Sequence, residues 1–339
     1  MKKTLLFITS LILLISCQKK QTKKLILKQE TGQALGTSYS VLYFAKAEKS
    51  NIEKSLDSIF LVVNKSMSTY IATSDISKIN KGDTTIVVDH MFKDVFNTSA
   101  DIYKETKGYF DPTVGNLVNA WGFGPQKYKL KMTPNTVDSL MQFVGFNKLS
   151  LTKEGLLKKS TPNVYLDFNA IAKGYCIDRI GDYLDSKLIN NYLIEVGGEL
   201  LAKGTHLEKQ KPWTVGIDNP TQKEERTLYA TLPLKNKGMA TSGNYRKFRL
   251  DSSSGKKYVH IIDAKTGFTK PSEILSVSVL ANTCAIADGY ATAFMAMPLE
   301  ETKKVLDKET DLEGYIIYSA PNGDLKTYAT KAFFFDSVN

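Results

Sequence analysis

Apolar residues recur at helical spacing in five stretches of the chain, and each stretch predicts an amphipathic helix. The five predicted helices cover residues 51–63, 91–107, 136–143, 171–184 and 284–297. In the first of them, the apolar face is formed by Ile52, Leu56, Ile59, Phe60 and Val63. Gly108 follows the second stretch and is placed to end that helix.

Short runs rich in β-branched and aromatic residues predict strands. These runs cover residues 39–44, 192–196, 213–217, 228–234, 245–250, 276–280, 314–318 and 332–335. Most lie in the second half of the chain and several follow one another with no helix between them, which favours antiparallel pairing. The predicted fold class is α+β, with antiparallel sheets and packed helices. No repeat or Pro/Gly/Ser-rich linker marks a domain boundary.

The N-terminus has the pattern of a bacterial export signal. Two lysines precede an apolar stretch over residues 5–15, which is too short to span a membrane. The sequence Leu14-Ile15-Ser16-Cys17 resembles the lipobox of lipoproteins, although an ordinary signal peptide with a chance cysteine is the alternative. We therefore predict a signal peptide over 1–16, a lipidated Cys17 with a basic tether over 17–28, and a globular domain over 29–339. The globular part is expected to begin near Leu25, on a protein anchored in the cell envelope that faces the periplasm or the exterior.

Most of the excess positive charge of the chain lies near its N-terminus. The 45 Lys+Arg and 35 Asp+Glu give a net charge of +10, which by itself could indicate a nucleic-acid partner. Seven of these positive charges lie in residues 1–28, so residues 29–339 carry only +3. No basic patch interleaved with aromatic residues continues into the domain, which argues against nucleic-acid binding. The 17 Tyr and 16 Phe exclude a mainly disordered chain.

Several common catalytic motifs are missing. The three histidines, His90, His206 and His260, are far apart, and Cys176 and Cys284 belong to no Cys-x-x-Cys motif, so a zinc site is improbable. The sequence also lacks a P-loop and a Gly-x-Ser-x-Gly elbow. It does not say whether the two cysteines pair.

Four residues carry candidate chemistry. Asp288 and Thr292 are four residues apart in a predicted helix and share one face, so two hard oxygen ligands could hold Mg²⁺. From spacing alone, a surface Asp and a Thr bonded to its own helix are favoured over a metal site. Lys173, in the first turn of a predicted helix, suits an anion site or is a solvated lysine. His260 is an acid/base candidate or a structural hydrogen-bonding residue.

Short polar and glycine-containing segments recur between the apolar stretches. Taken in order, they resemble the ApbE family, the FAD:protein FMN transferases. The matching segments are Gly36–Tyr39, Met67–Tyr70, Phe110–Gly115, Trp121–Gly124, Ala170–Tyr175, Val196–Glu199, Ala240–Tyr245, His260–Asp263 and Ala287–Thr292. Ala264 and Asn244 depart from the family pattern, which uses Pro and Asp there, and both concern turns.

The resemblance implies a fold similar to the tunnelling fold, with an FAD site between two subdomains. It implies an enzyme that splits FAD with Mg²⁺, joins FMN through a phosphoester to a Thr or Ser of an acceptor protein, and releases AMP. The implied metal ligands are Asp288, Thr292 and the carbonyl of Ala170. The implied FAD-site residues are Met67, Thr69, Tyr70, Asp111, Lys173, His260 and Ile262. His260 and Asp288 are the implied catalytic residues.

Two other functions remain open from the sequence. Some members of the family hydrolyse FAD to FMN and AMP. A different class is a non-catalytic flavin-binding lipoprotein that stores or delivers FAD. By analogy with the family, acceptors would be subunits of membrane redox complexes, of the sodium-pumping NADH:quinone reductase or Rnf type.

Overall fold

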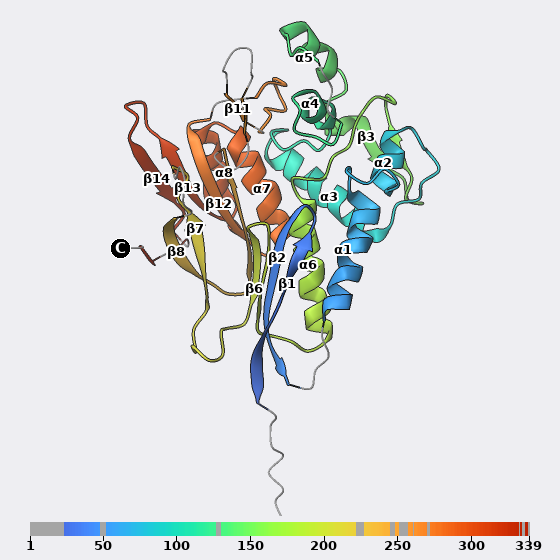
Figure 1. The fold of residues 1–339 in the computed structure, drawn as a ribbon. Helices are drawn as coiled ribbons and strands as arrows, with labels where there is room; N and C mark the ends of the chain where they lie inside the picture. Colours follow the sequence, from blue (N-terminus) through green and yellow to red (C-terminus); the bar gives the residue numbers. More distant parts are fainter. Residues whose placement is uncertain are drawn as a thin grey trace, which may run out of the picture.

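An eight-stranded antiparallel sheet forms the centre of the molecule (Figure 1). The computed structural model describes residues 24–47, 52–126, 130–221, 227–244, 248–250, 257–259, 261–269, 272–331, 333 and 336–337. Along the sheet the order is β1 (Leu25–Ala34), β2 (Thr37–Lys46), β5 (Tyr192–Val196), β6 (Glu199–Lys203), β9 (Lys237–Gly243), β12 (Ile274–Ala281), β13 (Glu313–Ser319) and β14 (Leu325–Ala329). The predicted α+β class with antiparallel sheets is confirmed.

The sheet is buried on both faces along much of its length. In β2, Tyr39, Val41 and Tyr43 point into the main core, whereas Leu42 and Phe44 point into a second core on the opposite face. Successive side chains of a strand point to opposite faces, so apolar residues at consecutive positions require cover on both sides. This requirement makes the sheet an inner layer.

Helices cover the face that bears the main core. They are α1 (Glu53–Met67), α2 (Asp75–Asn80), α3 (His90–Glu105), α4 (Gly115–Ala120), α5 (Pro134–Met141), α6 (Ala172–Ser186), α7 (Cys284–Ala296) and α8 (Leu299–Lys308), with a 3₁₀ turn over Phe146–Lys148. Helix α7 packs on β9 and β12, α6 packs against α7, and α1 packs against α6. A Cβ on Gly174 or Gly238 would lie only 2.4 Å from the backbone of Cys284. The start of α7 is therefore held tightly between α6 and β9.

A smaller sheet covers part of the other face. It comprises β7 (Trp213–Asp218), β8 (Leu228–Leu234) and β15 (Asp336–Ser337). Its Trp213 ring lies 6.1 Å from that of Phe44 on the central sheet. Two short hairpins complete the strands of the described chain: β3 (Leu149–Leu151) with β4 (Leu157–Lys159), and β10 (Phe248–Leu250) with β11 (Lys257–Val259).

A third, separate apolar cluster joins α4 and α5. Its buried members are Leu117, Trp121, Val137, Val144 and Ile262. The Trp121 Nε1 atom donates a hydrogen bond of 2.9 Å to the Gly267 carbonyl. Residues 261–269 are thereby attached to this helical region, which lies beyond the end of the central sheet in Figure 1.

The five predicted helices correspond to α1, α3, α5, α6 and α7. The structure adds α2, α4 and α8, which the periodicity did not predict. It also adds the strands β1, β3, β4, β6, β9, β11, β14 and β15. Strand β1 begins at Leu25, where the globular part was expected to start, so residues 25–28 are paired rather than part of a free tether. Residues 1–23, with the predicted signal peptide and Cys17, lie outside the described residues. In the described part of the chain, no helix has the length and apolar character needed to cross a membrane.

Candidate functional site

Helix α7 carries Asp288 into the interior against the start of α6. The helix begins because the Thr283 side chain caps it, accepting a hydrogen bond from Ile286 N at 3.3 Å. Asp178 of α6 accepts from the next free amides, those of Cys284 at 2.8 Å and Ala285 at 2.9 Å. These contacts fix the rotation of α7 about its axis, and they place the buried Asp288 carboxylate beside α6.

The contact between Asp288 and Gly174 satisfies an amide in the first turn of α6. The Gly174 amide donates to Asp288 Oδ2 at 3.1 Å. Gly174 is the third residue of α6, and an amide at that position has no acceptor within its own helix. Ala170 lies two residues before the first residue of α6. Thr292 lies one turn further along α7 and is half-buried.

Lys173 and Glu199 form an ion pair beside this contact. Glu199 is buried and begins β6 directly after a two-glycine turn in which Gly197 and Gly198 have φ values of 62° and 100°. A hairpin turn with two positive φ values favours glycine at both positions. The tight turn therefore delivers the Glu199 carboxylate to the N-terminus of α6, 26 residues away from Lys173 in the sequence. Glu199 was not among the predicted site residues, and the glycine pair before it was the available signal in the sequence.

The cluster of Asp288, Glu199 and Lys173 has one more negative than positive charge when all three groups are ionised. Burial, followed by the neighbouring Glu199 carboxylate, raises the pKa of Asp288 to about 8, and Lys173 opposes this shift only partly. A cation bound beside Asp288 would offset the excess negative charge. Its carboxylate, the Thr292 hydroxyl and the Ala170 carbonyl are hard oxygen donors of the kind that suits Mg²⁺. The residues present therefore fit the implied ion.

The described chain offers no richer set of ionisable ligands. No group of three or more His, Cys, Asp or Glu side chains suited to a metal ion occurs in it. Cys176 and Cys284 are both buried free thiols, so the two cysteines do not pair in this structure. A metal site at α6 and α7 would therefore depend on hydroxyl and carbonyl oxygens as well as on Asp288.

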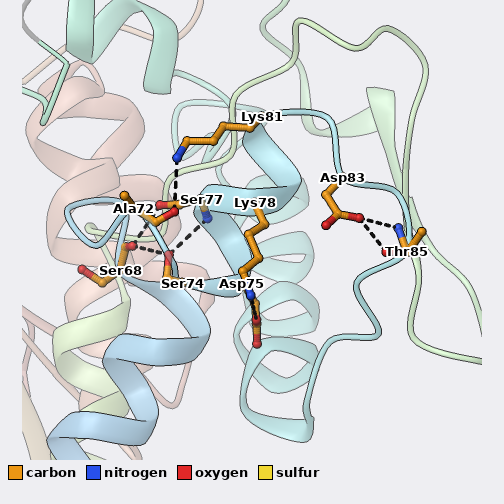
Figure 2. Close-up of polar contacts among 9 residues, drawn as sticks. All are labelled: Ser68, Ala72, Ser74, Asp75, Ser77, Lys78, Lys81, Asp83 and Thr85. Atoms are coloured by element: carbon orange, nitrogen blue, oxygen red, sulfur yellow. Dashed lines mark hydrogen bonds and ion pairs between the residues drawn. The ribbon is translucent and has the colours of Figure 1, made fainter.

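Met67 ends α1, and the loop that follows carries Thr69 and Tyr70 towards the segment before α6. Figure 2 shows how the loop is fixed: Ser74 Oγ donates to the Ser68 carbonyl at 2.6 Å, and Lys81 Nζ donates to the Ala72 carbonyl at 3.2 Å. Met67 is buried in the main core. Tyr70 is 62% exposed, so its ring is available to a ligand.

Helix α2 connects this loop to residues 166–170. Asn80 donates to the Leu166 carbonyl and accepts from the Leu166 amide, both at 2.8 Å. Further along, Asn169 Nδ2 donates to Thr69 Oγ1 at 3.2 Å. Burial raises the pKa of the neighbouring Asp167 to about 6. Both Asn80 and Asp167 were missed from the sequence, where a single Asn or Asp in a short segment carries no distinctive pattern.

Asp111 is buried in a neighbouring loop and is already hydrogen-bonded. Its carboxylate accepts from the amide and hydroxyl of Thr113, at 2.8 and 2.6 Å, and from Phe146 N at 3.2 Å. Burial raises its pKa, and these hydrogen bonds oppose the shift. The Pro112 carbonyl accepts from Asp167 N at 2.8 Å, which joins this loop to the segment before α6.

The remaining two predicted site residues belong to the segment after β11. Ile262 is buried in the cluster of α4 and α5, so in this structure it contributes to packing. Beside it, the Lys265 ammonium lies 3.9 Å from the centre of the Tyr109 ring. His260 lies outside the described residues.

A cavity of about 310 Å³ lies along the second half of α6, away from Lys173. Its charged lining groups already have partners: Arg179 and Asp182 are 2.6 Å apart, as are Lys203 and Asp185. Asp178, also in the lining, is engaged by the two amides of α7. We therefore place the candidate site at the start of α6 and not in this cavity.

Known proteins resemble the chain over nearly its whole length. A model of the ApbE family matches residues 35–316. A protein of Haemophilus influenzae named FAD:protein FMN transferase is 36% identical over 333 residues, covering 94% of this chain and 93% of its own. One of the same name from Vibrio cholerae is 31% identical over 339 residues, covering 98% of each.

Solved structures agree with the sequence comparison. The flavin transferase ApbE from Vibrio cholerae superposes with a TM-score of 0.82 at 30% identity, covering 91% of this chain and 98% of the other. The Pseudomonas stutzeri flavinyl transferase ApbE, in its apo form, gives a TM-score of 0.80 at 26% identity, covering 91% of this chain and 96% of the other. The resemblance inferred from the ordered segments is confirmed, and the chain belongs to the ApbE family.

Proposed function

We propose that the chain transfers the FMN half of FAD to a Thr or Ser hydroxyl of an acceptor protein. The acceptor oxygen forms a bond to the phosphorus of the FMN half, the pyrophosphate bond breaks, and AMP leaves. One observation carries the proposal: the buried Asp288 carboxylate accepts from the Gly174 amide in the first turn of α6, where Lys173 pairs with Glu199. Membership of a family whose relatives are named FAD:protein FMN transferase supports it.

Mg²⁺ is part of the proposal, with Asp288, Thr292 and the Ala170 carbonyl as the residues that would hold it. When bound, the ion offsets the negative charge that develops on the phosphates during transfer. The N-terminus of α6, with the Lys173 ammonium, suits the pyrophosphate because helix N-termini favour anions. Glu199 orients Lys173 through their ion pair.

The flavin or adenine ring is assigned to the loop that follows α1. Tyr70 offers an exposed aromatic face. Met67 and Thr69 support that loop, Asp111 holds the adjacent one, and Ile262 belongs to the segment that follows His260. We assign proton removal from the acceptor hydroxyl to His260, with Asp288 as the alternative base, because an alcohol is a weak nucleophile without a positioned base.

The cellular setting is a further part of the proposal. The lipobox-like sequence at Cys17 would anchor the protein to a membrane of the cell envelope, with the domain facing the periplasm or the exterior. The acceptors would then be exposed subunits of membrane redox complexes of the sodium-pumping NADH:quinone reductase or Rnf type. Sequencing the mature N-terminus and measuring its mass would test the lipid modification.

The activity is tested by incubating the protein with FAD, Mg²⁺ and a candidate acceptor. We expect a fluorescent flavin that stays with the acceptor in a denaturing gel, and one AMP for each flavin transferred. Asp288→Asn should abolish both signals and weaken Mg²⁺ binding measured by calorimetry. AMP release without an acceptor would instead identify an FAD hydrolase, and intact FAD with no labelled acceptor would refute the proposal.

A further inference from the structure

Three chain segments meet at the end of the molecule where β1 begins (Figure 1). The open end of the β1–β2 ribbon pairs Leu25 with Lys46. Asn191 follows α6, and its carbonyl accepts from Phe44 N of the ribbon at 2.9 Å. The Asn191 side chain accepts from Thr205 N, also at 2.9 Å, so the loop 204–211 is held alongside. We call residues 24–28, 44–47, 186–191 and 204–211 the ribbon end.

The ribbon end is strongly basic. It contains six lysines and a single acidic residue, Glu208. The lysines are Lys24, Lys28, Lys46, Lys187, Lys209 and Lys211, all of them exposed except Lys28, which is partly exposed. The nearby Asp182 and Asp185 each lie 2.6 Å from a cation, Arg179 and Lys203, so these aspartates do not offset the lysine charge.

Exposed aliphatic side chains accompany the lysines. Leu188 is 84% exposed, and Leu25 and Ile26 are 40% and 39% exposed. Leu188 follows α6 with a φ of 57°, in the left-handed region where glycine or asparagine is usual. A leucine there is disfavoured by the backbone and adds little to the core. Its side chain is therefore explained neither by helix termination nor by packing.

We propose that the ribbon end docks on an anionic lipid membrane, an inference that rests on the proposed N-terminal lipid anchor. The seven residue-to-residue steps from Cys17 to Lys24 can span at most about 25 Å, so an acyl chain on Cys17 keeps the ribbon end close to the membrane. Lysines near an anionic surface are attracted to its headgroups, and exposed aliphatic side chains enter the headgroup region. The composition of the ribbon end matches both requirements.

Docking in this orientation raises the candidate site above the membrane. Helix α6 has 15 residues, which corresponds to about 22 Å of helix. Leu188 lies just beyond its last turn, whereas Lys173 lies in its first turn at the candidate site. The acceptor hydroxyl must therefore be presented on the order of 20 Å from the lipid surface.

The test uses the mature chain from residue 17 with Cys17→Ser, which keeps the tether and the whole fold but carries no lipid. Its binding to phosphatidylcholine vesicles with and without phosphatidylglycerol is measured by sedimentation. The triple variant K187E/K209E/K211E should bind the anionic vesicles at least about tenfold more weakly, since each lysine accounts for about a fivefold change. The control K153E/K326E/K331E changes exposed lysines elsewhere by the same net charge and should lose less than about threefold.

A second variant tests the membrane surface without changing the net charge and without an expected loss of stability. Leu188→Asn should raise thermal stability, because asparagine tolerates the left-handed backbone, and it should still weaken vesicle binding severalfold. Equal losses in the two triple variants would overturn the proposal, because the tether and net charge would then account for binding. The proposal would also be overturned if the ribbon-end variants bound vesicles as well as the parent chain but differed from it in self-association or in binding to an acidic protein.

The vesicle-binding test and the test of the proposed function can fail independently of each other. FAD turnover of both triple variants in solution, without vesicles, should equal that of the parent chain. A parent chain that binds vesicles as expected but leaves FAD intact would refute the enzymatic proposal and not the membrane surface.

Discussion

Replacing Gly174 with alanine tests the close approach on which the candidate site depends. The added Cβ would lie 2.4 Å from the Cys284 carbonyl oxygen and 2.8 Å from the Ala285 Cα. Both atoms belong to the backbone of α7, so no side-chain rotation can relieve the clash. Normal van der Waals contact requires α6 and α7 to separate by roughly 1 Å. The hydrogen bond from the Gly174 amide to Asp288 would then lengthen from 3.1 Å beyond a useful distance.

The expected loss of stability follows from two opposing effects. Overpacking of this kind costs about 1–3 kcal/mol or more, whereas alanine is favoured over glycine in a helix by about 1 kcal/mol. Because the clash is with backbone, we expect Gly174→Ala to lower the free energy of unfolding by about 2 kcal/mol. FAD turnover should fall by about 10²-fold, the effect of a 1 Å displacement in an active site.

Gly181→Ala in the same helix is the matched control. Its new Cβ would meet Leu201 Cδ2 at 2.7 Å and the Tyr192 hydroxyl at 3.0 Å, both at the ends of side chains that can move. The gain in helix propensity should then leave stability within about 1 kcal/mol of the parent, with turnover retained. Urea unfolding and AMP release measure the two quantities. If Gly174→Ala behaves like Gly181→Ala in both assays, the argument from the α6–α7 contact is wrong.

Three other predictions concern buried polar groups. Burial raises the pKa of Asp288 to about 8, so the folded metal-free chain keeps a proton that the unfolded chain loses above about pH 4. Its unfolding free energy in EDTA should therefore fall as pH rises towards 8, by up to about 1.4 kcal/mol per unit from this group, and Asp288→Asn should flatten the profile between pH 7 and 8. Asp178→Asn turns an amide group towards one of the two N–H donors of α7, and should cost about 1–3 kcal/mol in urea unfolding. Asn80→Asp removes the N–H group that donates to the Leu166 carbonyl, and it should raise the KM for FAD more than it lowers kcat. An unchanged KM would contradict the role of α2 in connecting the loop after α1 to residues 166–170.

Long elements with a clear period could be predicted from the sequence. The apolar residues of α7 predicted this helix from the sequence. Because Asp288 and Thr292 are four residues apart in it, they were predicted to share one face. Helix α2 has only six residues, too few to show a period, although its Ser74 cap is a usual start signal. Strand β1 is mostly polar on its exposed positions, so only its pairing with β2 identifies it.

The candidate site could be predicted only in part, because much of it depends on contacts between distant segments. From the spacing of Asp288 and Thr292 alone, Asp288 was expected to be a solvent-exposed residue of the helix surface. The family resemblance was needed to assign it to a metal site. The partnership of Lys173 with Glu199 depends on the fold that brings the hairpin turn to α6, and no local pattern encodes it. The hydrogen bond from the Gly174 amide to Asp288 likewise forms only once α7 is in place.

The hydrogen bond from Gly174 to Asp288 also sets an order of events during synthesis. It joins residues 114 positions apart, so a growing chain can form α6 long before α7 exists. Contacts of high sequence separation close late in folding because the loop entropy must be overcome first. A chain interrupted before residue 284 would therefore lack Asp288 altogether. We expect such fragments to leave FAD uncleaved, so that flavin is consumed only by molecules that have been completed.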